Sequence, residues 1–135
     1  YLKEYLNKLK KLNNNIFITS NGNEYKMYSK VYTIIDHEIL FNKQKFDYFD
    51  LKNLYFKNRV NHSNSEINIR IKELSLKEKI IFLNKEDYMC EVKKKECYYI
   101  DNDGNKLMFD SSHYTRSGAA FFGEKIYELN WLKLN

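Results

Sequence analysis

The sequence predicts an α/β domain with a parallel sheet, and two of its segments carry this prediction. Near the start, an amphipathic helical pattern over residues 2–12 is followed by a short apolar run at 16–19. Later, a helical pattern over residues 66–75 precedes a second apolar run at 80–83. A helix followed by a short apolar strand is half of a βαβ unit, and the strands of such units run parallel.

A chain of 135 residues suits a single domain, residues 1–135, with a core of its own. The net charge is +5, from 23 basic and 18 acidic residues. The basic run Lys93-Lys94-Lys95 is flanked by Glu91 and Glu96, so we expect no nucleic-acid partner. A basic nucleic-acid module is therefore a weak alternative. No apolar run approaches the ~18 residues of a membrane-spanning helix.

The first helix is predicted from an apolar stripe with lysines on its other faces: Leu2, Leu6, Leu9 and Leu12. Three asparagines at residues 13–15 end it, and residues 16–19 form the first apolar strand. In open α/β sheets, ligands bind beyond the carboxyl ends of the strands. The loop and its neighbours at residues 20–25 are therefore a candidate rim of the site.

Residues 24–60 show no clean period, and we expect an irregular insertion with short helices. Within it, residues 31–35 fit either a strand or part of a helix. His37 and His62 have no Cys or His partner at a zinc-ligand spacing. Both are therefore interpreted as surface histidines.

The helix over residues 66–75 follows a loop at 61–65, and Ser65 is its expected N-cap. We expect three apolar residues of this helix to face inward: Ile67, Ile71 and Leu74. The run at residues 80–83 is apolar throughout, which predicts a buried strand.

Cys90 and Cys97 are the only cysteines, and six residues lie between them. This spacing fits neither a CxxC redox pair nor half of a zinc site. On the residues alone, two reduced thiols and a disulfide stay equally open. A disulfide would imply an oxidising compartment, because reducing compartments keep thiols free.

The candidate catalytic residues lie where a predicted strand at 106–109 leads into the last helix. Asp110 stands three residues before His113, so a tight turn can present both side chains to the same side. A carboxylate beside a histidine fixes the imidazole tautomer and stabilises its protonated form, as a general base for a hydroxyl nucleophile requires. Thr115 is the expected N-cap of the helix. Its apolar positions are spaced by three and four residues: Ala119, Phe122, Ile126 and Leu129.

By spacing alone, Asp-x-x-His also fits a turn with a surface histidine, but the surrounding residues favour catalysis. Residues 98–119 resemble the last block of SGNH hydrolases, most strongly the SGNH domain fused behind membrane-embedded acyltransferases that O-acylate bacterial surface polysaccharides. Those domains end in a strand, an Asp-Gly turn, an aromatic-rich strand and Asp-x-x-His-Leu-[Ser/Thr]-x-x-Gly-Ala. The matching residues are Asp110, His113, Thr115, Gly118 and Ala119, and Tyr114 replaces the Leu. The strong part of the resemblance covers residues 90–123.

This resemblance implies a three-layer SGNH-type (flavodoxin-like) parallel sheet with flanking helices. It implies that His113 acts as general base and then as general acid, with Asp110 orienting it. It also implies a disulfide between Cys90 and Cys97, and an extracytoplasmic domain, periplasmic or cell-surface, of a membrane protein. The implied partners are an acyl donor, a sugar acceptor and an upstream membrane acyltransferase domain. No metal or organic cofactor is expected, because an oxyanion hole carries the electrostatic load.

The serine nucleophile of that family is the missing part. SGNH enzymes place it in a Gly-Asp-Ser-like block after the first strand, and the chain, with only four glycines, contains no such block. Ser20, Ser111 and Ser112 are the possible hydroxyls. The chain also starts at Tyr1 and not at a methionine. We therefore expect the C-terminal part of a longer SGNH domain, inactive by itself.

Two other functions stay open at this point. An esterase of the same fold would remove acyl groups, since the sequence does not separate transfer to a sugar from transfer to water. A catalytically inactive glycan-binding or scaffolding domain would keep the fold without the reaction.

Overall fold

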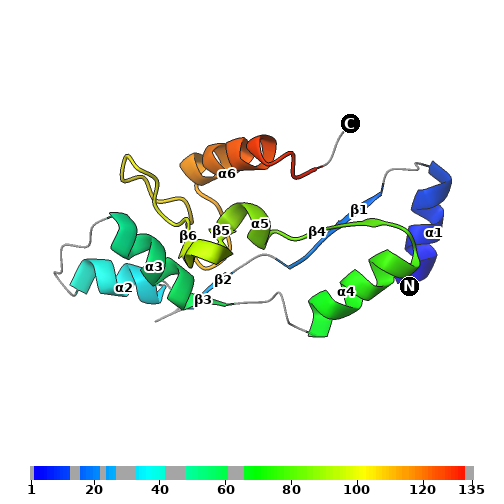
Figure 1. Cartoon of the computed structure of the whole chain (residues 1–135), viewed down its shortest axis with the longest axis horizontal. Coiled ribbons are helices and arrows are strands. Elements are labelled where there is room, and N and C mark those ends of the chain that lie inside the picture. Colours follow the sequence, from blue (N-terminus) through cyan, green and yellow to red (C-terminus); the bar gives the residue numbers. More distant parts are fainter. Residues whose placement is uncertain are drawn as a thin grey trace.

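The computed structural model describes residues 2–12, 16–21, 24–26, 33–41, 48–60 and 66–132. Short strands alternate with helices along these segments. Their order is α1 (Leu2–Leu12), β1 (Phe17–Thr19), β2 (Glu24–Tyr25), α2 (Ile34–Phe41), α3 (Tyr48–Asn58), β3 (Arg59–Val60), α4 (Glu66–Lys77), β4 (Ile81–Leu83), α5 (Glu86–Met89), β5 (Cys90–Glu91), the 3₁₀ turn η1 (Val92–Lys94), β6 (Glu96–Cys97) and α6 (Arg116–Glu128). Figure 1 shows α1, β1, β4 and α4 towards one end of the molecule and α2 and α3 at the other.

The two apolar strands predicted from the sequence pair in parallel. β1 and β4 run side by side, with Phe17 opposite Ile81 and Thr19 opposite Leu83. Helix α1 precedes β1 and α4 precedes β4, as expected for βαβ-type connections. The prediction of an α/β domain with a parallel sheet is therefore confirmed. The three-layer arrangement stays a prediction.

The second strand is less buried than its apolar sequence predicts. Leu83 is buried, whereas Ile81, on the same face of the strand, is 36% exposed. Leu83 belongs to the buried hydrophobic cluster, whereas Ile81 does not.

Helix α4 is rotated slightly from the predicted orientation, since only Ile71 and Leu74 of the three residues expected to face inward are partly buried. Ile67 is exposed, and the buried residues of this helix are Asn68 and Ser75. Asn68 is drawn inward because its Oδ1 accepts a hydrogen bond from the Asn21 N–H at 2.9 Å. The inward orientation predicted for Ile67 is therefore wrong. The expected N-cap, Ser65, lies outside the described residues.

The insertion contains more regular structure than its sequence indicates. β2 pairs with β3 in an antiparallel sheet, and α2 and α3 pack against each other. Ile34 begins α2, so the ambiguous stretch ends in a helix and not in a strand. Three buried tyrosines connect this region to the C-terminal half: Tyr25, Tyr55 and Tyr99. The Tyr25 and Tyr99 rings meet edge to face with centroids 4.8 Å apart, a favourable aromatic geometry.

The two cysteines form a disulfide, as the resemblance implies. Cys90 and Cys97 lie directly opposite each other in the β5–β6 pair, and both are buried. The Tyr98 N–H donates to the Met89 carbonyl at 3.0 Å and continues the pairing. The bridge therefore closes a small loop directly before the segment that leads to Asp110.

The strand predicted at residues 106–109 is not formed. This segment makes only single bridges, Ile100 with Lys106 and Met108 with Tyr114. Side-chain carboxylates accept backbone N–H bonds in the tight turns on both sides, and these turns leave too few residues between them for a ladder. The segment is instead held by isolated backbone bonds, among them Leu107 N–H to Tyr99 C=O at 2.7 Å.

The last helix begins where it was predicted to begin. Thr115 is its N-cap, with the Gly118 N–H donating to the Thr115 hydroxyl at 2.9 Å. The buried residues of α6 are Gly118 and Phe122, whereas Ala119 and Leu129 of the predicted apolar stripe are exposed. The Gly118 face of the helix points inward, because the backbone at Gly118 lies so close to the Leu107 carbonyl that no side chain fits there.

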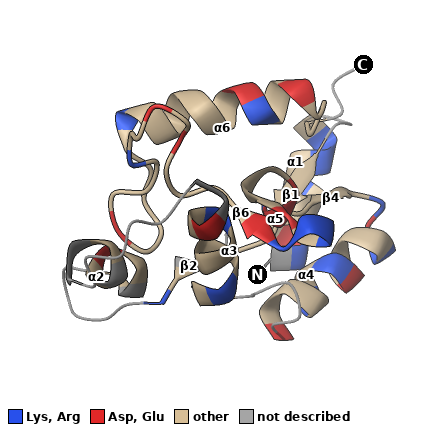
Figure 2. Cartoon of the chain, turned by 60° about the vertical axis from the view of Figure 1, so that its left-hand side comes forward, with Lys and Arg blue, Asp and Glu red and all other residues tan. Residues whose placement is uncertain are grey.

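Charges of both signs are interspersed along the outer helices. Figure 2 shows lysine or arginine alternating with aspartate or glutamate on α4 and α6. No helix among the described segments is long and apolar enough to cross a membrane.

Candidate active site

Asp110 and His113 form a closed pair in the turn before α6. The His113 Nδ1 lies 2.8 Å from Asp110 Oδ2 and 3.0 Å from Oδ1. Oδ1 also accepts the backbone N–H groups of Ser112 and His113, each at 2.9 Å. The Phe109 N–H donates to the His113 carbonyl at 2.6 Å and closes the turn. A single carboxylate therefore fixes both the backbone of the turn and the imidazole.

The charge of Asp110 is stabilised by these same contacts. Hydrogen bonds from the Ser112 N–H, and then from the His113 side chain and N–H, lower the pKa of Asp110 from 3.8 to about 2. The carboxylate is therefore ionised at neutral pH and only accepts hydrogen bonds. Neutral His113 consequently carries its proton on Nδ1, which leaves the lone pair of Nε2 available to take a proton. The His113 side chain is 76% exposed, so a reacting group has access to it.

The turn is anchored on two sides by hydrogen bonds. The Ser111 carbonyl accepts the Tyr25 N–H of β2 at 3.0 Å. Thr115, two residues after His113, donates its hydroxyl to the Lys106 carbonyl at 2.6 Å. β2 follows β1 along the chain. Through the contact of β2 with Ser111, the Asp110–His113 pair lies beside the segment that follows the carboxyl end of β1. This is the edge at which ligands bind in open α/β sheets.

Tyr114, which replaces leucine in the family pattern, is a packing residue. Its ring lies 4.9 Å from that of Phe122, and its hydroxyl lies 3.0 Å from the Tyr88 hydroxyl. Burial raises the pKa of Tyr114. The side chain therefore connects the turn to the aromatic core.

The structure does not bring a candidate serine hydroxyl to His113. The Ser20 hydroxyl is buried, where it donates to Asn84 Oδ1 at 3.2 Å and accepts the Lys85 N–H at 2.9 Å. It thereby joins the carboxyl ends of β1 and β4. Within the described part of the chain, neither this hydroxyl nor those of Ser111 and Ser112 is hydrogen-bonded to the imidazole.

Metal ligands do not gather in the described segments, where no group of three or more His, Cys, Asp or Glu residues could hold an ion. His37 lies half-buried on α2. His62, the other histidine interpreted as a surface residue, lies outside the described residues.

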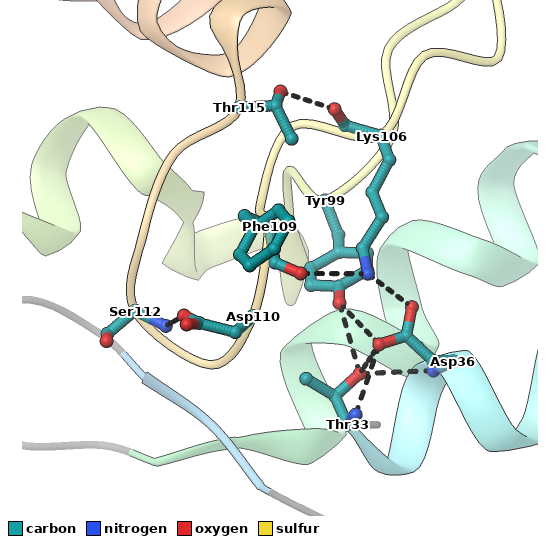
Figure 3. A network of polar contacts seen from close by, with 8 residues as sticks. All are labelled: Thr33, Asp36, Tyr99, Lys106, Phe109, Asp110, Ser112 and Thr115. Carbon is teal, nitrogen blue, oxygen red and sulfur yellow. Dashed lines mark hydrogen bonds and ion pairs between the residues drawn. The ribbon is translucent and has the colours of Figure 1, made fainter. Parts of the chain in front are cut away.

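An ion pair near the turn, between a buried carboxylate and a half-exposed lysine, was not predicted from the sequence. Asp36 of the insertion lies 2.8 Å from the Lys106 Nζ, although the two residues are far apart in the chain (Figure 3). The local signal was the Thr33-x-x-Asp36 pattern before an apolar run, which is a helix-capping arrangement. That pattern gave no indication of the distant lysine.

The described residues form a mixed α/β domain with a short parallel sheet, and an Asp-x-x-His turn opens its last helix, as expected of an SGNH domain. The family model described as the SGNH domain fused to AT3 domains matches residues 1–128. The chain belongs to this family, and the match extends well upstream of the block that carries the resemblance. Neither the curated proteins nor the solved structures contain a significant match.

Proposed function

We propose that this chain supplies the base half of a serine-dependent O-acyltransferase that modifies bacterial surface glycan. The observation that carries the proposal is the Asp110 carboxylate holding His113 Nδ1 at 2.8 Å in an anchored turn. The fusion of this family to AT3 domains supports an acyltransferase domain in the parent chain. The two together favour acyl transfer over a purely structural role for the turn.

The proposed reaction has two half-reactions. In each of them, His113 accepts one proton and then gives it up. First, a serine hydroxyl gives its proton to Nε2 while its oxygen attacks the acyl carbonyl. His113 then protonates the leaving group, and an acyl-serine ester is left. A sugar hydroxyl next gives its proton to Nε2 and attacks this ester, and the proton returns to the serine oxygen. Asp110 stabilises the imidazolium each time it forms.

The proposal places the nucleophilic serine outside residues 1–135. Ser20 is already committed to Asn84 and Lys85, and Ser111 and Ser112 precede His113 too closely in sequence for the usual geometry. We also propose an extracytoplasmic location, which the buried Cys90–Cys97 disulfide supports because such bonds persist in oxidising compartments.

The isolated chain is expected not to turn over acyl esters. Without the serine, His113 is only a weak general base on water, and the sequence contains no recognisable Gly and Asn blocks of the kind that supply the oxyanion donors in this family. Hydrolysis of p-nitrophenyl acetate by residues 1–135 should therefore equal that of the His113→Ala variant. Strong His113-dependent turnover by the isolated chain would contradict the proposal, and Ser20→Ala would then be the next variant to test.

A further inference from the structure

A polar cluster around the buried Asp36 carboxylate joins the insertion to the segment that carries the candidate pair. Its members are Thr33, Asp36, Tyr99 and Lys106 (Figure 3). Asp36 is 8% exposed, and its Oδ2 accepts the Thr33 hydroxyl at 2.9 Å and the Tyr99 hydroxyl at 3.1 Å. Its Oδ1 lies 2.8 Å from the Lys106 Nζ. Both oxygens of a nearly buried carboxylate are thus engaged, as burial of a charge requires.

Lys106 extends this cluster to the turn itself. Besides Asp36, its Nζ donates to the carbonyl of Phe109 at 3.3 Å. Phe109 directly precedes Asp110, and its N–H closes the turn on the His113 carbonyl. The lysine is therefore hydrogen-bonded to the carbonyl of the residue directly before Asp110. Its own carbonyl accepts the Thr115 hydroxyl, so it contacts both ends of the turn.

At the insertion end of the cluster, Thr33 and Asp36 are hydrogen-bonded to each other in both directions. The Asp36 N–H donates to the Thr33 hydroxyl at 3.1 Å while the Thr33 N–H donates to Asp36 Oδ2 at 3.1 Å. This reciprocal capping box fixes the first turn of α2. The same carboxylate therefore caps a helix and binds the lysine.

We propose that Asp36 and Lys106 are positioning residues that hold the Asp110–His113 turn in its paired geometry. The inference rests on the proposed function only for its effect on acyl transfer. It assigns a role to the insertion, whose helix α2 supplies the Asp36 carboxylate that binds Lys106 next to the turn. Loss of either residue should leave the fold intact but release the Phe109 peptide, so that the imidazole and the carboxylate separate for part of the time.

Two spectroscopic readouts test this role without any substrate. The first is the ¹⁵N signature of His113 at a pH where the imidazole is neutral, because the bond to Asp110 selects the Nδ1–H tautomer. The second is the pKa of Asp110, followed by its ¹³C carboxyl shift. We expect Lys106→Met and Asp36→Asn to introduce the Nε2–H tautomer and to raise the pKa of Asp110 from about 2 towards 3.8.

The Asp36→Asn variant separates positioning from simple electrostatics. Removing the negative charge of Asp36 would lower the pKa of Asp110 if charge alone mattered, whereas release of the turn raises it. Lys125→Met is the matched control, because Lys125 is similarly exposed, pairs with Glu128 at 2.7 Å and lies near a tyrosine ring. The control should keep the wild-type tautomer and the wild-type pKa of Asp110.

The Trp131 indole resonance reports that each variant is folded, since its Nε1–H donates to the Asn84 carbonyl at 2.9 Å, away from the cluster. Lys106→Met replaces a side chain that is 37% exposed, so this variant should fold and provides the test if Asp36→Asn does not fold. A folded Lys106→Met protein with the wild-type tautomer overturns the inference, as does an unchanged or lowered pKa of Asp110 in folded Asp36→Asn. A disrupted pair with unchanged acyl transfer would contradict the proposed function and leave the inference standing.

Discussion

Replacing His113 with alanine is expected to lower acyl transfer about 10⁴- to 10⁶-fold in a protein that contains both this chain and the serine. The variant removes the only group proposed to accept the serine proton and to return it to the leaving group. Binding of donor and acceptor should be little changed, so the loss should fall on kcat and not on KM. Acyl transfer to a soluble glycan acceptor, followed by mass spectrometry, measures it.

A second experiment replaces Asp110, with the same substitution at Asp101 as its control. Asp110→Asn should lower kcat by about 10²- to 10⁴-fold, because an amide neither stabilises the imidazolium nor selects the Nδ1–H tautomer. Asp101 accepts backbone N–H bonds in a similar turn, at 2.7 Å from Asn105 and 3.0 Å from Asp103, and has no histidine partner in its turn. Asp101→Asn should retain near wild-type activity. Equal losses in the two variants would mean that turn stability, and not the pair, controls the rate.

Replacing Gly118 with alanine is expected to destabilise the protein by more than about 4 kcal/mol, at the extreme of single substitutions. A Cβ at Gly118 would lie 1.8 Å from the Leu107 carbonyl oxygen and 2.7 Å from its carbon. Both atoms are backbone, so no side-chain rotation relieves the clash. Helix α6 would have to move away from the segment that holds the turn, and the Thr115 cap would be broken with it.

Gly123 offers the matched control for this substitution in the same helix. A Cβ there meets no atom within 4 Å, so Gly123→Ala should stabilise the protein by about 1 kcal/mol through helix propensity. Urea unfolding, followed by the fluorescence of the buried Trp131, measures both free energies of unfolding. Similar stabilities for the two variants would show that α6 does not pack on Leu107 as closely as described.

Two of the features predicted correctly from the sequence depend on neighbouring residues. The Thr115 cap forms within a few residues and is visible as a pattern. The contact between Asp110 and His113 was also expected from their spacing, although their catalytic role stays a proposal. The parallel pairing of β1 and β4 followed from the helix–strand order.

The features that were missed depend on partners distant in sequence. Asp36 lies in the insertion and Lys106 lies in the segment before the turn, and no local pattern relates the two residues. Ile67 was assigned to the core of α4 by apolarity, but Asn68 took the inward position through its bond to Asn21. The strand at residues 106–109 was predicted from apolar residues, whereas the turns on both sides limited its pairing. Tertiary contacts overrode local preference in each case.

The central claim, that Asp110 and His113 activate a serine outside residues 1–135, is tested most directly by labelling the parent protein with a fluorophosphonate. Such a probe bonds to a serine oxygen only where a general base has activated it. Peptide mapping should place the adduct on a serine upstream of Tyr1, and His113→Ala should slow its formation by several orders of magnitude. An adduct on Ser20, or labelling at the same rate without His113, would contradict the claim.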